Sequence, residues 1–145
     1  MSKAAAQTEF TGACLCGGIQ FRIHSELAPI QICHCLQCRK AQGGPFATNI
    51  PVARSAFEVV GGAQLLRCYE SSPGKFRYFC GACGSPVYSC RDQLPQVVRI
   101  RAGLIDGPLP VRLGSQAYVA SKANWWTIDD RLPAFAQARD PAGAS

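Results

Sequence analysis

The sequence predicts a mainly β protein with few short helices, and three observations lead to this prediction. Apolar residues alternate with polar ones at a period of two in several short stretches, as in half-buried strands. Turn-forming residues are frequent, with 14 Gly and 10 Pro in 145 residues. Nine Cys fall mostly into tight clusters, which favours a fold built around bound metal.

One domain is the expected organisation of a chain of this length. We expect residues 9–138 to form it, with disordered ends at residues 1–8 and 139–145, which are small, polar and Ala-rich. No stretch approaches the roughly 20 apolar residues of a membrane span, and the start lacks the apolar core of a signal peptide. We therefore expect a cytoplasmic protein that makes no membrane contact.

The strands come in order along the chain, beginning where Ile19, Phe21 and Ile23 alternate with polar residues. Helical signal is slight, with one or two turns expected over residues 36–42, ending at Gly43, and a short closing helix over residues 130–137. The remaining strands are expected over residues 46–50, 57–60, 64–70, 75–79, 86–90, 97–102 and 116–120.

The cysteines carry the functional information. An odd count in a chain without an export signal disfavours disulfides, because the cytosol keeps thiols reduced. Two thiolates two or three residues apart can reach one tetrahedral ion, and a following glycine lets the backbone turn around it. The clusters are Cys14-x-Cys16, Cys33-His34-Cys35-x-x-Cys38 and Cys80-x-x-Cys83.

Counting ligands divides these clusters between two ions. A two-cysteine cluster fills half of a tetrahedral site, so the pair Cys14 and Cys16 most economically shares an ion with the pair Cys80 and Cys83. That arrangement is a closed structural zinc site. The site can supply on the order of 10 kcal/mol of apparent binding free energy to folding.

The remaining cluster, Cys33, Cys35 and Cys38, supplies three ligands and leaves one position open. His34 is a poor fourth ligand, because neighbouring side chains in an extended stretch point in opposite directions. Three protein ligands with an open position are typical of catalytic zinc. Three thiolates leave the site negatively charged, which favours a soft substrate thiol over water activation.

At these residues the chain resembles the glutathione-dependent formaldehyde-activating enzyme family, also called the CENP-V/GFA domain, over about residues 11–135. The resemblance implies an Mss4-like fold of coiled antiparallel β-sheets built around two zinc sites. It implies the same division of the cysteines into structural and catalytic ligands. It rests on Gly12-Ala13-Cys14-Leu15-Cys16-Gly17, Cys33-His34-Cys35-Leu36-Gln37-Cys38-Arg39-Lys40 and Phe79-Cys80-Gly81-Ala82-Cys83-Gly84-Ser85, with Lys122-Ala123-Asn124-Trp125-Trp126 and Asp129-Asp130-Arg131-Leu132-Pro133-Ala134-Phe135 near the end.

The reaction that the resemblance implies is carbon–sulfur bond formation or cleavage, in the founding case between the thiol of glutathione and formaldehyde. We expect a zinc-dependent carbon–sulfur lyase that acts on glutathione or a glutathione adduct together with an aldehyde. Two Zn²⁺ ions per chain are the implied cofactors. Gln116 stands where many members have His, and the chain is shorter than the founding enzymes. The identity of the carbonyl substrate is therefore left open, as is a homodimer.

Several alternatives remain beside this interpretation. Both zincs could be structural, with water, Cys68 or Cys90 completing the second site; Cys68 is expected to be buried and Cys90 partly exposed. A non-catalytic module for nucleic acid or protein is suggested by the net charge of +6, but the basic residues are scattered, so nucleic acid is not the expected partner. A zinc hydrolase is the third alternative. His34, Arg39 and Lys40 are candidates for substrate binding or for support of the metal ligands.

Overall fold

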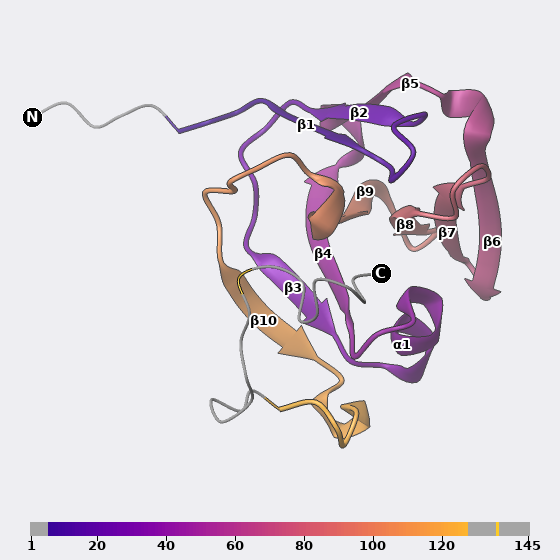
Figure 1. Ribbon diagram of the computed structural model, residues 1–145, viewed down its shortest axis with the longest axis vertical. Coiled ribbons are helices and arrows are strands. Elements are labelled where there is room, and N and C mark those ends of the chain that lie inside the picture. The colour runs from indigo at the N-terminus through magenta and orange to yellow at the C-terminus, as the bar shows by residue number, and fades with distance from the viewer. Residues whose placement is uncertain (1–5, 128–135, 137–145) are drawn as a thin grey trace, which may run out of the picture.

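The computed structural model describes residues 6–127 and residue 136, which form two β-sheets and one short α-helix (Figure 1). The smaller sheet has the strand order β1-β2-β5, and the larger one has the order β10-β3-β4-β9-β8-β7-β6. The predicted mainly β fold is confirmed. The strands are β1 (Phe10–Ala13), β2 (Gln20–Ile23), β3 (Ile30–Cys33), β4 (Ala47–Ala53), β5 (Phe57–Gly61), β6 (Leu66–Ser72), β7 (Lys75–Cys80), β8 (Pro86–Arg91), β9 (Leu94–Arg101) and β10 (Leu113–Ala117).

All strand pairs in the two sheets are antiparallel except one. β10 pairs with β3 in parallel, with Gln116 opposite Ile32 and Ala117 opposite Cys33. A parallel pair needs a long connection between its strands, and the chain between β3 and β10 supplies it by running through most of the larger sheet. β10 thereby ends beside the segment that follows β3 (Figure 1).

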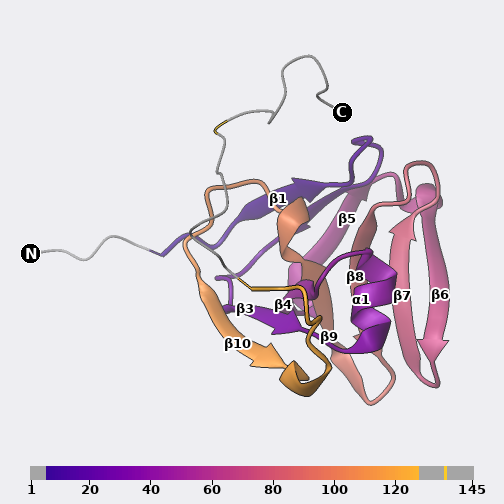
Figure 2. The same ribbon diagram turned by 60° about the horizontal axis from the view of Figure 1, so that its bottom comes forward.

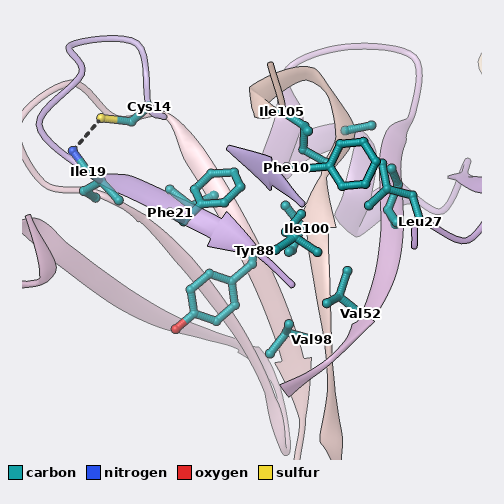
Figure 3. Packing of buried hydrophobic residues seen from close by; sticks show 14 of the residues in the cluster. Phe10, Cys14, Ile19, Phe21, Leu27, Val52, Tyr88, Val98, Ile100 and Ile105 are labelled. Carbon is teal, nitrogen blue, oxygen red and sulfur yellow. Dashed lines mark hydrogen bonds between the residues drawn. The ribbon is translucent and has the colours of Figure 1, made fainter. Parts of the chain in front are cut away.

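The hydrophobic core lies between the two sheets (Figure 3). Phe10 and Phe21 of the smaller sheet and Tyr88, Val98 and Ile100 of the larger one are all at most 9% exposed. A fully buried side chain of this kind contributes about 1.5–3 kcal/mol relative to an exposed one. The core therefore holds the two sheets together and occupies one face of the larger sheet.

The opposite face of the larger sheet is polar although it is also buried. Asn49 on β4 lies opposite Arg101 on β9, and Arg77 on β7 lies opposite Ser89 on β8. All four side chains are less than 9% exposed. The Arg101 Nη1 donates to Asn49 Oδ1 and, at 3.4 Å, to Ser89 Oγ.

The one α-helix of the described residues, α1 (Leu36–Gln42), lies over this polar face (Figure 2). Cys35 caps the start of the helix, because its side chain accepts a hydrogen bond from the Cys38 backbone N–H, and Gly43 caps its end. Gly43 adopts φ +66°, a left-handed conformation that suits glycine and terminates the helix. Both predicted boundaries of this helix are confirmed.

Some sequence predictions of secondary structure were wrong. β1 and β3 were not predicted, because four-residue strands give too few alternating positions to detect. The strand expected over residues 116–120 lies over Leu113–Ala117. The strand expected over residues 64–70 begins only at Leu66, after a 3₁₀ turn over Ala63–Leu65. The expected helix over residues 130–137 lies outside the described residues except for residue 136.

None of the helices in the described part of the chain is long and apolar enough to cross a membrane.

Candidate metal centres

The two cysteine pairs that the sequence predicts to share one ion lie together in the structure. The Sγ atoms of Cys14, Cys16, Cys80 and Cys83 all lie within 4.8 Å of one another. The Cys14–Cys16 distance is 3.5 Å and the Cys16–Cys80 distance is 3.9 Å. Four sulfurs placed tetrahedrally at a Zn–S distance of about 2.3 Å are about 3.8 Å apart. The cluster therefore fits a tetrahedral thiolate site.

Each half of this cluster sits on a tight turn at the end of a strand. Gly17 follows the first pair with φ +76°, and Gly84 follows the second with φ +79°. Backbone N–H groups point at the sulfurs, from Ile19 to Cys14 Sγ at 3.2 Å and from Cys83 to Cys80 Sγ at 3.4 Å. Such donors stabilise thiolates, so the backbone itself prepares these sulfurs for a cation.

The three-cysteine cluster is formed where β3 passes into α1. Cys33 ends β3, Cys35 is the residue before the helix, and Cys38 lies in its first turn with 1% exposure. Their Sγ atoms lie within 4.8 Å of one another. Cys38 N–H donates to Cys35 Sγ at 3.3 Å. These three sulfurs could hold a metal ion and would leave one tetrahedral position for another ligand.

His34 does not belong to this cluster. Its ring is fully buried, packs edge-on against Phe46 with centroids 5.4 Å apart, and donates from Nε2 to Gln116 Oε1 at 2.8 Å. The backbone N–H of His34 donates to the Ala117 carbonyl at 3.0 Å. His34 therefore links β10 to the segment that carries the three cysteines. In the family that the sequence resembles, the His that many members have at the position of Gln116 would contact His34.

A pocket of about 690 Å³ lies beside the three-cysteine cluster. Cys33 and Cys35 line it together with Lys75 and Arg91, from the strands β7 and β8. Its volume lies within the range of about 300–1,000 Å³ that is usual for sites of small ligands. A ligand in this pocket can reach the sulfurs that would hold the metal; we call it the cysteine pocket.

Positive charge is concentrated behind the same cluster. Arg77 Nη2 donates to Cys38 Sγ at 3.7 Å. Burial and the nearby charge of Arg77 lower the pKa of Lys75, and the same two causes lower the pKa of Arg101 to about 10. Burial and the nearby charge of Arg91 lower the pKa of Arg99. Burial is the main cause of each shift, and repulsion between the neighbouring cations adds to it. An anionic centre at the three sulfurs relieves that repulsion.

The cations that line the cysteine pocket are not the ones singled out in the sequence. Arg39 on α1 donates to the Ser121 carbonyl at 3.2 Å, and Lys40 is exposed; neither lines the pocket. A role for them in substrate binding stays a prediction. Sequence reasoning missed Lys75 and Arg91. Lys75 and Arg77 lie two residues apart on β7, which places two cations on one face, and this was the available signal.

The two single cysteines lie opposite to expectation. Cys68 is exposed on β6, which forms an edge of the larger sheet, and Cys90 is 8% exposed on β8 in its interior. Both burial predictions were wrong, because local sequence does not reveal which strand is an edge. Neither cysteine belongs to the two clusters.

The fold and these clusters define a class of mainly β proteins that carry two cysteine sites able to hold metal ions, one of four sulfurs and one of three beside a pocket. The model of the family described as "Glutathione-dependent formaldehyde-activating enzyme" matches residues 9–127. The chain belongs to this family.

Two further similarities agree with that assignment. A Halomonas elongata protein named "Putative glutathione-dependent formaldehyde-activating enzyme" is 33% identical over 130 residues, which cover 83% of this chain and 81% of that protein. The crystal structure of a Rhodobacter sphaeroides protein superposes with a TM-score of 0.59 at 24% identity, covering 72% of this chain and 99% of that one. The structural similarity supports the fold.

Proposed function

We propose that this chain is a zinc-dependent carbon–sulfur lyase that joins a thiol to an aldehyde or cleaves the resulting adduct. The observation that carries the proposal is the three-cysteine cluster on the wall of a ligand-sized pocket, one donor short of a tetrahedral shell. The thiol is glutathione, and the reactant of the cleavage direction is a glutathione adduct, in keeping with the family to which the chain belongs.

Two zinc ions per chain are the cofactors in this proposal. Cys14, Cys16, Cys80 and Cys83 hold the structural ion, and the cluster at Cys33, Cys35 and Cys38 holds the other. Soft thiolate donors in tetrahedral spacing suit zinc well. When bound to the three-cysteine shell, zinc supplies the positive charge that keeps a substrate thiol ionised near neutral pH.

The charges of the cysteine pocket are complementary to glutathione. Glutathione carries two carboxylates and one ammonium group at neutral pH. Lys75 and Arg91 line the pocket as cations, and Asp92 lines it as an anion. We assign the two cations to the carboxylates and Asp92 to the ammonium group. Cys33 and Cys35 line the same pocket, which allows the thiol of a ligand held in this way to approach their sulfurs.

In the synthetic direction the sulfur of the ionised thiol adds its electron pair to the aldehyde carbon. A carbon–sulfur bond forms, the carbon–oxygen π bond breaks, and the resulting alkoxide takes up the proton that the thiol released. The reverse reaction regenerates both reactants. The half-buried ammonium group of Lys75 stabilises negative charge in this pocket. Arg77, which donates to Cys38 Sγ, balances the charge of the thiolate cluster from behind.

The arrangement of the cations also bears on the competing interpretation as a nucleic-acid module. Arg77 is 8% exposed and Arg101 is 4% exposed, so neither adds to a basic stripe on the protein surface of the kind that a phosphate backbone follows. Cations that line pockets, half-buried in one and buried in the other, support a small anionic ligand instead. The match to residues 9–127 further supports a single domain over about residues 9–138.

The test measures zinc per chain and glutathione-dependent aldehyde consumption in the wild type and in two cysteine variants. Cys35→Ala removes one ligand of the three-cysteine cluster, and Cys68→Ala removes an exposed cysteine outside both clusters as the matched control. We expect two zincs and turnover in the wild type and in Cys68→Ala. A folded Cys35→Ala variant should keep one zinc and lose turnover. Full turnover in Cys35→Ala, or absence of thiol-dependent turnover in the zinc-loaded wild type with any aldehyde tried, would overturn the proposal.

A further inference from the structure

A second pocket, of about 330 Å³, lies at the other end of α1. Ala41 and Gln42 of the last helical turn form one wall, and Arg77 and Arg101 of the polar sheet face lie among its lining residues. It shares no lining residue with the cysteine pocket, which lies at the first turn of the helix. We call it the arginine pocket.

The two arginines have donors without acceptors. Arg77 donates from Nε to Ser71 Oγ at 2.9 Å and from Nη2 to Cys38 Sγ, but its buried Nη1 has no partner. Arg101 donates from Nη1 to Asn49 and Ser89, and its buried Nε has none. A buried donor left unpaired costs about 1–3 kcal/mol, and more when it is charged.

Within the described residues, no carboxylate forms an ion pair with either arginine. The ion pairs found in the described residues join His24 to Glu9 and Glu58, and none involves either arginine. The residues described as lining the arginine pocket include no acidic side chain. Cys38 offers one sulfur to Arg77 and none to Arg101. Among the described residues, Cys38 is therefore an anionic partner for Arg77, and the pocket lining offers no such partner to Arg101.

The rest of the lining is apolar and aromatic. Tyr69 and Phe79 contribute rings on the sheet face that carries Arg77, and Pro86 and Ala41 contribute aliphatic surface. An inorganic anion would satisfy the arginines but leave this apolar surface in contact with water.

We propose that the arginine pocket binds a small organic carboxylate with an aromatic or branched apolar body, held by Arg77 and Arg101. The carboxylate supplies planar acceptors that match the geometry of guanidinium groups. The apolar body covers the rings and the helix wall. A volume near the lower end of the usual range suits a ligand of about the size of benzoate.

The position of Arg77 gives such a ligand a route to the metal centre. The same guanidinium group lines the arginine pocket and donates to Cys38 Sγ, so an anion on one side competes for positive charge with the sulfur on the other. The binding itself does not depend on catalysis. It can therefore succeed or fail independently of the proposed lyase function.

The experiment titrates benzoate into the zinc-loaded full-length chain by isothermal calorimetry. We expect saturable binding of one benzoate per chain, with the neutral analogue benzamide at least about tenfold weaker because it lacks the charge that the arginines require. Arg101→Gln removes the guanidinium group and should weaken benzoate binding at least about tenfold.

A second variant tests the pocket without altering the arginines. Ala41 is exposed on α1, so Ala41→Phe should fold normally while its ring fills the arginine pocket and blocks benzoate. Arg22→Gln removes an exposed arginine of the smaller sheet and should bind benzoate as the wild type does. Thermal melting of each variant confirms that it is folded.

Three results would overturn the proposal. The first is no saturable benzoate binding to the wild type, which would mean that water alone solvates the two arginines. The second is equal binding of benzamide and benzoate, or tighter binding of inorganic phosphate. The third is unchanged benzoate affinity in folded Ala41→Phe.

Discussion

The contact between Arg77 and Cys38 predicts how strongly the three-cysteine cluster would hold the second zinc ion that we propose. In the variant Arg77→Gln the guanidinium group that donates to Cys38 Sγ at 3.7 Å is replaced by a neutral amide. The three-thiolate shell then keeps its negative charge without the nearest balancing cation. We expect weaker zinc binding at this cluster and unchanged binding at the four-cysteine cluster, which lacks this contact.

The magnitude follows from distance and burial. Two unit charges 3.7 Å apart attract by roughly 4–5 kcal/mol at an effective dielectric constant of 20, and the cost of keeping Arg77 buried offsets part of this. Hydrogen bonds that involve a charged group contribute about 1.5–3 kcal/mol net. Partners behind metal ligands usually change metal affinity by about 10- to 100-fold. We expect the second zinc to bind about 10- to 100-fold more weakly.

Competition with a coloured zinc chelator measures both sites in one titration. Arg67→Gln is the matched control, because Arg67 lies on the neighbouring strand β6 and donates only to backbone carbonyls of residues 64 and 66. The control should titrate as the wild type does. Equal affinity of the second zinc in folded Arg77→Gln and in the control would refute the reasoning, and a loss at both sites would point to a general packing defect.

Three further outcomes are expected. Gly62→Ala should lower the free energy of unfolding by at least about 2 kcal/mol in chemical denaturation, because residue 62 has φ +76° and a Cβ there would lie 2.9 Å from the Cα atom of Ile19. Gly44→Ala is the control, because a Cβ at residue 44 would have nothing within 4 Å. Its free energy of unfolding should stay within about 0.5 kcal/mol of the wild-type value. Proton NMR should find the pKa of His24 above 6.5, raised by hydrogen bonds to Glu9 and Glu58, and Glu58→Gln should bring it down. The stabilisation from protonated His24 is therefore present below pH 6.5 and lost as the pH rises through the raised folded value, and a stability profile of opposite slope that Glu58→Gln abolishes would contradict this. Stripping both metals with a chelator should abolish the cooperative thermal transition, and adding zinc should restore it; an unchanged transition would rule out a structural metal.

Ligand chemistry made the cysteine sites predictable from sequence. The pairing of Cys14 and Cys16 with Cys80 and Cys83 followed from counting donors, because a tetrahedral ion demands four whatever the fold around it. The helix over residues 36–42 was equally local, since Gly43 ends it through its own backbone conformation. Both predictions needed only neighbouring residues and the geometry of one ion.

Long-range packing decided the features that sequence reasoning missed. Arg99 and Arg101 alternate on β9, and period two places them on one face, but only α1 crossing that face buries Arg101. Lys75 and Arg91 meet at the cysteine pocket because β7 and β8 pair with these two residues opposite each other. Strand order and the position of α1 are properties of the whole chain, so no local pattern contains them.

The cytoplasmic location, the disordered ends and the homodimer stay predictions.

The spacing of the four-cysteine cluster along the chain predicts an order in which the two clusters would take up metal during synthesis. Its halves are 64 residues apart between Cys16 and Cys80, whereas the three-cysteine cluster is complete once Cys38 has been added. The last ligand, Cys83, follows Cys38 by 45 residues, which at about 5–20 residues per second takes roughly 2–9 s. During that interval a nascent chain offers a complete three-sulfur site before the closed site exists. Chains stalled before Cys80 should therefore bind one metal ion, and the full-length chain two.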